Sequence, residues 1–222
     1  MKLKESTTQR QPQDEVSATN QFVVSLHELV VLFVGITSIT AIVALAVERF
    51  SIPFVLVVAS LGTIATAFRF EYFKGKNFSQ PKPLITAVLL SGLLLRLEHW
   101  PNLTGGQDQG LYVNMASALR KNGSLEFIDH FREELSTESQ VVYDQAVLLS
   151  VSVVDSVRSA TTIEFYPLHP VWMAINEYVF GPYGRHLSLL GFSLLGMVGA
   201  YHLAKEIDGR KSVATLFTAL IA

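Results

Sequence analysis

The chain has 222 residues, of which 50% are hydrophobic and 16% are charged, and it contains no cysteine. Soluble domains carry about 25% charged residues, so this composition excludes a soluble globular enzyme and a disordered chain. The 17 basic and 19 acidic residues leave a net charge of −2, whereas nucleic-acid-binding proteins carry a basic excess. The absence of cysteine excludes disulfides, thiolate metal sites and a cysteine nucleophile.

The first hydrophobic segments predict a membrane-spanning hairpin that follows a polar tail. Residues 1–20 are polar, and we expect them to be disordered. Residues 29–47 are free of charge, and a helix of this length crosses about 30 Å of hydrocarbon. A second apolar stretch, 52–68, follows a short charged turn. We therefore predict an added hairpin with a basic loop over residues 21–82, ahead of a membrane module over 83–222.

The charges between the segments predict the orientation in the cell membrane. Residues 69–82 hold Arg69, Lys74, Lys76 and Lys82 against Glu71 alone. By the positive-inside rule this loop and the N-terminus are cytoplasmic, and the next segment, from Pro83, runs outward. Residues 97–165 contain ten acidic and four basic residues, and we expect them to form a large extracytoplasmic loop.

Three further apolar segments follow this loop, at 165–180, 187–204 and 212–222. The segment 168–180 either lies along the outer interface or crosses the membrane, and the sequence leaves both alternatives open. The last segment stops after eleven residues, about half a span, so we expect a chain truncated at its C-terminus. The predicted fold is an all-α polytopic membrane protein with about five to six hydrophobic helices.

The large loop has its own pattern. Leu111, Tyr112, Met115, Ala116 and Leu119 share one face of a helix that ends at Asn122-Gly123. We expect this amphipathic helix to lie on the membrane surface. A second short amphipathic helix is predicted over 124–135, and a small β-hairpin from 146–154 and 161–165.

Asp108 stands at the start of the first amphipathic helix and has two compatible interpretations. It can be a helix N-cap, because aspartate is preferred there. It can also be a carboxylate held at the membrane–water boundary beside Gly105-Gly106, where the absence of side chains lets a substrate approach the backbone.

Several motifs occur in an order that resembles the amino-terminal part of the GT-C superfamily of polytopic glycosyltransferases. The nearer branch is similar to protein O-mannosyltransferases and aminoarabinose transferases, and the likeness covers about residues 83–222. The motifs are Arg96, the stretch GGQDQGLYVNMASALRKNGSL over 105–125, FYPLHPVW over 165–172, Phe180-Gly181 and Gly209-Arg210.

The resemblance implies transfer of a sugar from a polyprenyl-phosphate carrier to a glycan, lipid or protein acceptor on the outer face. In that family the first outer loop begins with an acidic residue, which Asp108 matches as the catalytic base, while Gln109 stands where a second acid is frequent. A positioned carboxylate can accept the proton of an acceptor hydroxyl. Substrate-binding candidates surround this position: Gly106, Gln107, Gln109 and Tyr112.

Two residues at the start of the next apolar segment, His169 within it and Glu164 directly before it, complete the candidate site. His169, in the stretch YPLHP, matches the position of a His-Pro or Lys-Pro pair in the family and could donate to the lipid phosphate or the acceptor; it could also only cap or pack at the interface. Glu164 could supply a second acid or be a solvated loop residue.

The partners expected are the lipid-linked donor, the acceptor and membrane lipid. The histidines show no metal-ligand spacing, so no metal site is predicted and no cofactor is certain, although assistance by a divalent cation stays open. The alternatives to an enzyme are a transporter subunit, an interaction protein of the membrane, or an inactive truncated fragment.

Overall fold

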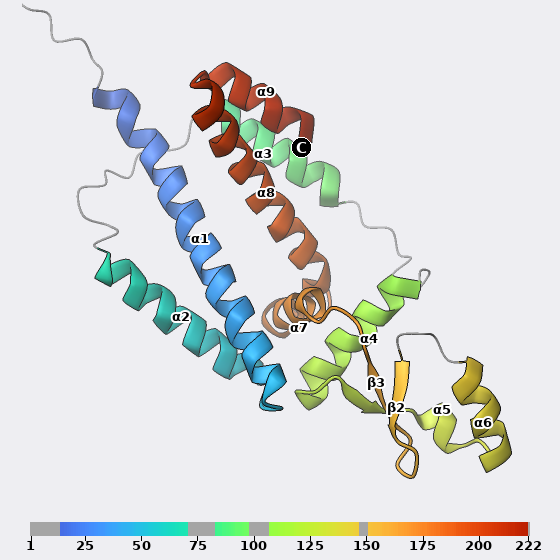
Figure 1. Ribbon diagram of the computed structural model, residues 1–222. Coiled ribbons are helices and arrows are strands. Elements are labelled where there is room, and N and C mark those ends of the chain that lie inside the picture. The colour runs from blue at the N-terminus through green and yellow to red at the C-terminus, as the bar shows by residue number, and fades with distance from the viewer. Residues whose placement is uncertain (1–13, 71–82, 98–106, 147–150, 222) are drawn as a thin grey trace, which may run out of the picture.

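A computed structural model describes residues 14–70, 83–97, 107–146 and 151–221 (Figure 1). Most of these residues form helices, and a small sheet stands beside them. In chain order the elements are α1 (Asp14–Ala46), α2 (Ile52–Arg69), α3 (Pro83–Leu97), α4 (Gln107–Asn122), β1 (Glu126–Ile128), α5 (His130–Glu133), α6 (Thr137–Ala146), β2 (Val151–Asp155), β3 (Ala160–Ile163), α7 (Leu168–Phe180), α8 (Gly184–Asp208) and α9 (Lys211–Ile221).

Fewer helices are long enough to cross a membrane than the sequence predicted. Within the described ranges three qualify by length and apolar composition, namely Leu26–Ala46 of α1, α2, and Gly184–Ile207 of α8. The other hydrophobic segments do form helices, but α3, α7 and α9 have 15, 13 and 11 residues. At 1.5 Å per residue none of these three covers about 30 Å of hydrocarbon. The expectation of five to six spans is therefore corrected to three candidates.

The N-terminal helix begins earlier than expected. α1 starts at Asp14, inside the segment for which a disordered tail was predicted. Residues 1–13 lie outside the described part of the chain.

The main core joins the α1–α2 hairpin to α4 and α7. Its buried members include Ala44 of α1, Val55 of α2, Leu119 of α4 and Val171 of α7. Gly123 ends α4 at a positive φ of 66°, and a Cβ there would lie 2.6 Å from the carbonyl oxygen of Phe50. The turn after α1 and the end of α4 can approach this closely because residue 123 has no side chain.

The apolar face of α4 is buried within the protein and does not rest on the membrane surface as predicted. Leu111 and Met115 pack with Ile163 of β3, while Ala116 and Leu119 join the core formed with α1, α2 and α7. The periodic pattern predicted a helix that starts at Asp108 and ends at Asn122-Gly123, and the structure confirms a helix there, from Gln107 to Asn122. An amphipathic pattern identifies the face to be covered, but it does not say whether lipid or protein covers it.

The sheet is larger than the predicted hairpin. β2 and β3 pair antiparallel, close to the predicted ranges, and β1 adds to the other edge of β3 to give the order β1-β3-β2. The predicted amphipathic helix over 124–135 is therefore wrong, since 126–128 is a strand and only the short α5 is helical. Phe127 packs against the cluster of Leu111, Met115 and Ile163, and this non-local contact overrides the local pattern.

A buried arginine holds the small helices against the sheet. Arg132 of α5 donates to both carboxylate oxygens of Asp144 on α6, at 2.8 and 2.9 Å. It also donates to the carbonyl of Ser156 and to the hydroxyl of Ser159 in the β2–β3 turn, at 3.0 and 3.1 Å. We call α5, α6 and the three strands the lobe, and Figure 1 shows it beside α4.

The C-terminal helices form a second packing unit. Tyr201 of α8 and Ala214 of α9 are buried together, with Leu89 of α3 packed against them. α7 meets α8 at a sharp joint, because a Cβ on Gly184 would lie 2.0 Å from the carbonyl oxygen of Asn176. In Figure 1, α7 is viewed nearly end-on while α8 runs across the picture, so the two helices cross steeply at this joint.

Candidate functional site

The residues predicted to carry the chemistry lie at the starts of α4 and α7. α4 begins at Gln107, so Gln107, Asp108 and Gln109 form its first turn. Gly106, predicted to bind substrate, lies outside the described residues. α7 begins at Leu168, which puts His169 in its first turn. Tyr112 follows Asp108 by four positions in the same helix.

Tyr112 links these two helix starts. Its ring meets the ring of His169 edge-on, with centroids 5.3 Å apart, and lies 5.2 Å from the ring centroid of Phe165. Aromatic rings favour such edge-to-face contacts, which add about 0.5–1.5 kcal/mol to simple burial. Two candidates that stand 57 positions apart in the sequence are therefore in direct contact.

His169 is half-buried, and this burial lowers the pKa of its imidazole because a charged ring loses its hydration there. The neutral ring is therefore favoured near pH 7. A neutral imidazole keeps one N–H donor and one acceptor nitrogen, so it can form hydrogen bonds to a substrate without carrying a charge.

Glu164 lies just beyond β3 and is exposed to solvent. Its Oε1 accepts a hydrogen bond of 2.6 Å from the hydroxyl of Ser152 on the neighbouring strand β2. The next residue, Phe165, contacts Tyr112. Glu164 is thus the chain neighbour of Phe165, which contacts Tyr112, while its own carboxylate is hydrogen-bonded to the sheet.

A charged group that the sequence analysis missed ties α4, α7 and α8 together. Glu177 of α7 is 5% exposed. Its Oε1 forms an ion pair with Nη1 of Arg120 on α4, at a distance of 2.9 Å. Its Oε2 accepts from Nε of Arg185 on α8, whose Nη2 donates to the hydroxyl of Ser117 at 3.1 Å. The signal was present in the sequence, because Glu177 is the only charged residue of the apolar segment 165–180. A carboxylate in such a segment needs a charged partner when buried.

Glu177, Arg120 and Arg185 form a triad that connects the helices on which the candidate site lies. Two arginines face one carboxylate, so the group carries a net positive charge of one. It bridges the far end of α4 to the joint between α7 and α8, while Tyr112 and His169 join the same two helices near their starts. α4 is therefore attached to α7 at two levels, through Tyr112 and through Arg120.

Within the part of the chain that the structure describes, no group of three or more histidine or acidic side chains is arranged to hold a metal ion. Comparisons of the chain with protein-family models, with curated proteins and with solved structures find no match.

Proposed function

We propose that the chain is the amino-terminal part of a membrane glycosyltransferase. It transfers a sugar from a polyprenyl-phosphate-linked donor to an acceptor on the extracytoplasmic face, and Asp108 serves as the base. The family resemblance of residues 83–222 motivates this proposal. Three apolar helices compatible with membrane insertion support it.

One structural observation carries the proposal further. Tyr112, one helical turn after Asp108 in α4, contacts His169 in the first turn of α7. This contact between residues from the two motif stretches supports the proposal that α4 and α7 share one site. A catalytic site needs such a fixed arrangement, because positioning of reacting groups supplies a large share of rate enhancement.

In the proposed step the acceptor hydroxyl attacks the anomeric carbon of the donor sugar. A new C–O bond forms there as the bond to the phosphate oxygen breaks, and that oxygen leaves with the bonding electron pair on the polyprenyl phosphate. The hydroxyl proton passes to the carboxylate of Asp108, a transfer typically worth about 10²- to 10⁴-fold in rate. Neutral His169 donates a hydrogen bond to the leaving phosphate or the acceptor.

The test uses the complete protein in membranes and a panel of polyprenyl-phosphate-linked hexoses and pentoses. The readout is acceptor-dependent release of polyprenyl phosphate. Since α4 begins at Gln107, Asp108 lies within its first turn and is not the N-cap. Asp108→Asn keeps the size and shape of that side chain, but it removes the base. We expect a loss of about 10²-fold or more. The matched control is Glu138→Gln, an exposed acid of the lobe, which should keep full activity.

The results of this assay test the role of Asp108 and the transferase activity separately. Unchanged release in Asp108→Asn would reject Asp108 as the base. No release by the unaltered protein with any donor of the panel would reject the transferase and favour the non-enzymatic alternative, an interaction or transporter subunit.

A further inference from the structure

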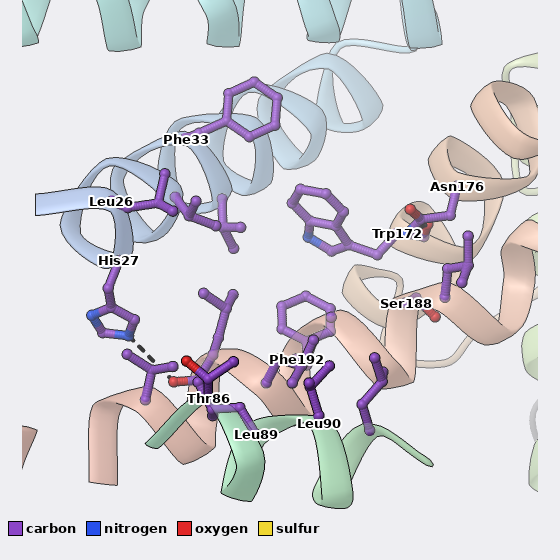
Figure 2. Close-up of a pocket in the computed structure, with 18 residues that line it drawn as sticks. Leu26, His27, Phe33, Thr86, Leu89, Leu90, Trp172, Asn176, Ser188 and Phe192 are labelled. Atoms are coloured by element: carbon purple, nitrogen blue, oxygen red, sulfur yellow. Dashed lines mark hydrogen bonds between the residues drawn. The ribbon is translucent and has the colours of Figure 1, made fainter. Parts of the chain in front are cut away.

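An apolar groove of about 660 Å³ lies between α1, α3 and α8, with Trp172 of α7 at one end (Figure 2). Ligand sites in proteins commonly enclose about 300–1,000 Å³. Figure 2 shows Trp172 reaching from α7 into the space between α1 and α8, with Leu89 and Leu90 of α3 along the lower side. The groove is separate from the aromatic contact of Tyr112 and His169, neither of which lines it.

Three polar side chains of the lining form hydrogen bonds to backbone carbonyls of the protein. His27 Nε2 donates to the carbonyl of Leu195 at 3.2 Å, and Asn176 donates to the carbonyl of Trp172 at 2.9 Å. Ser188 donates to the carbonyl of Arg185 at 2.8 Å. The lining residues include no Asp, Glu, Lys or Arg. The groove therefore suits an uncharged hydrocarbon, which gains from burial without needing hydrogen bonds.

We infer that this groove binds one acyl chain of a bilayer phospholipid. Two of its walls, α1 and α8, are candidate membrane spans, so the groove would open toward lipid. Along α8 it runs from Leu187 to Val198, about 16 Å at 1.5 Å per residue. One leaflet of the hydrocarbon core is about 15 Å thick, so an acyl chain matches this length and a longer polyprenyl chain does not.

Other occupants fit the groove less well. The segments of this chain outside the described ranges, 1–13, 71–82 and 98–106, all contain charged residues, and 147–150 has only four residues. A charged segment would lose its hydration in a lining that offers no counter-charge. The inference does not require the transferase activity, and the two can fail separately.

The chain offers a matched pair of variants on α8. Gly191 lines the groove, and a Cβ added there meets nothing within 4 Å. Gly191→Leu should therefore fill the groove without strain in the backbone. A Cβ on Gly196 also meets nothing within 4 Å, but Gly196 does not line the groove. Gly196→Leu thus makes the same chemical change on the same helix outside the proposed site.

The experiment measures retained lipid by native mass spectrometry. The full chain is reconstituted in phosphatidylcholine vesicles that contain a small fraction of polyprenyl phosphate, and is then released into mild detergent. We expect one phosphatidylcholine per chain in the unaltered protein and in Gly196→Leu, and about tenfold less in Gly191→Leu. A second measurement needs no variant: phosphatidylcholine with a photoreactive acyl chain should label peptides of α3 and α8 that line the groove more strongly than the exposed face of α2.

Four results would overturn the inference. Equal retention in all three proteins would show only general lipid contact. Retention of polyprenyl phosphate in place of phosphatidylcholine would assign the groove to the longer chain. A dimer that Gly191→Leu alone abolishes would assign it to a second copy of the protein. Photolabelling that is strongest on α2 would place the acyl chain elsewhere.

Discussion

Glu177 of α7 and Arg120 of α4 form a 2.9 Å ion pair in which the carboxylate is almost fully buried. The same carboxylate meets Arg185 at the start of α8. One acid thus holds three helices, of which α4 is separated from α7 and α8 along the chain by the whole lobe. A buried charge of this kind destabilises the folded protein strongly when it has no partner. The triad should therefore contribute to the free energy of unfolding of the whole helical assembly.

We predict that Glu177→Gln lowers the free energy of unfolding by about 2 kcal/mol. Removal of one partner of a buried ion pair costs about 3–5 kcal/mol, and the partial exposure of both arginines reduces this cost. Thermal unfolding in detergent measures the change. Glu133→Gln, which removes the exposed pair with His130, should leave the unfolding temperature unchanged because exposed pairs contribute little. Equal shifts in the two variants would contradict a special role for Glu177.

The sequence predicted the apolar helices and α4 because apolar runs and hydrophobic periodicity are local properties, but it missed α6 and wrongly predicted a helix over 124–135. All the apolar segments and the helix over 107–122 form helices, and the Asn122-Gly123 signal coincides with the end of α4. The partners of each helix were not predictable in this way. Burial of Leu111 and Met115 against Ile163 depends on a contact across about fifty residues, and no local pattern records it.

The sequence selected candidate residues but did not predict how they are arranged. Tyr112 and His169 were each selected, but their contact arises from the packing of α4 on α7. The strand β1 was missed for a similar reason, since Phe127 has the spacing of a helix and becomes a strand residue only by pairing with Thr161. Glu177 gave a signal as the lone charge of an apolar segment, yet its arginine partners lie on two other helices.

We predict that the stability of the protein falls as the pH drops below about 6.5, in part through His169. Burial lowers the pKa of His169 from its ordinary value of 6.5, so the unfolded chain binds more protons than the folded chain between the lowered pKa and 6.5. Stability then rises with pH across that window and is fully present above it. The ring of His169 meets the ring of Tyr112 edge-on, with centroids 5.3 Å apart.

The check is the unfolding temperature measured between pH 5 and pH 7.5 for the unaltered protein and for His169→Gln. The variant should lose less stability on acidification, because it lacks the buried group that must take up a proton. The comparison with His130→Gln, at an exposed histidine, separates this effect from a general loss of histidine. Identical slopes in all three proteins would show that His169 does not titrate in this window.

The lobe should open locally when Arg132 loses its forked hydrogen bonds. Arg132 is 3% exposed and connects α5 to Asp144 of α6 and to the β2–β3 turn. Lysine keeps the charge but cannot reproduce the planar pair of donors. For Arg132→Lys we expect amide hydrogen exchange over 137–160 to become about tenfold faster, while α1 and α8 stay unchanged.

The control for this prediction is Arg158→Lys. Arg158 pairs with Asp155 across an exposed turn, and its loss should change exchange only at that turn. If Arg132→Lys left exchange over 137–160 unaltered, the lobe would be held by its sheet and by the cap at Asp129, and not by the arginine.

The orientation in the membrane can be tested directly because the chain has no cysteine. Figure 1 shows the lobe and the link between α8 and α9 at opposite ends of the helices. Val157, in the β2–β3 turn, is 92% exposed, and Ser212, on the first turn of α9, is exposed as well. In intact cells an impermeant maleimide should modify Val157→Cys and spare Ser212→Cys, which should react only after permeabilisation. α7 is too short to span the membrane, so this pattern requires α8 to run inward from the side of the lobe. The reverse pattern would place Asp108 and His169 in the cytoplasm, where the proposed transfer on the outer face cannot occur.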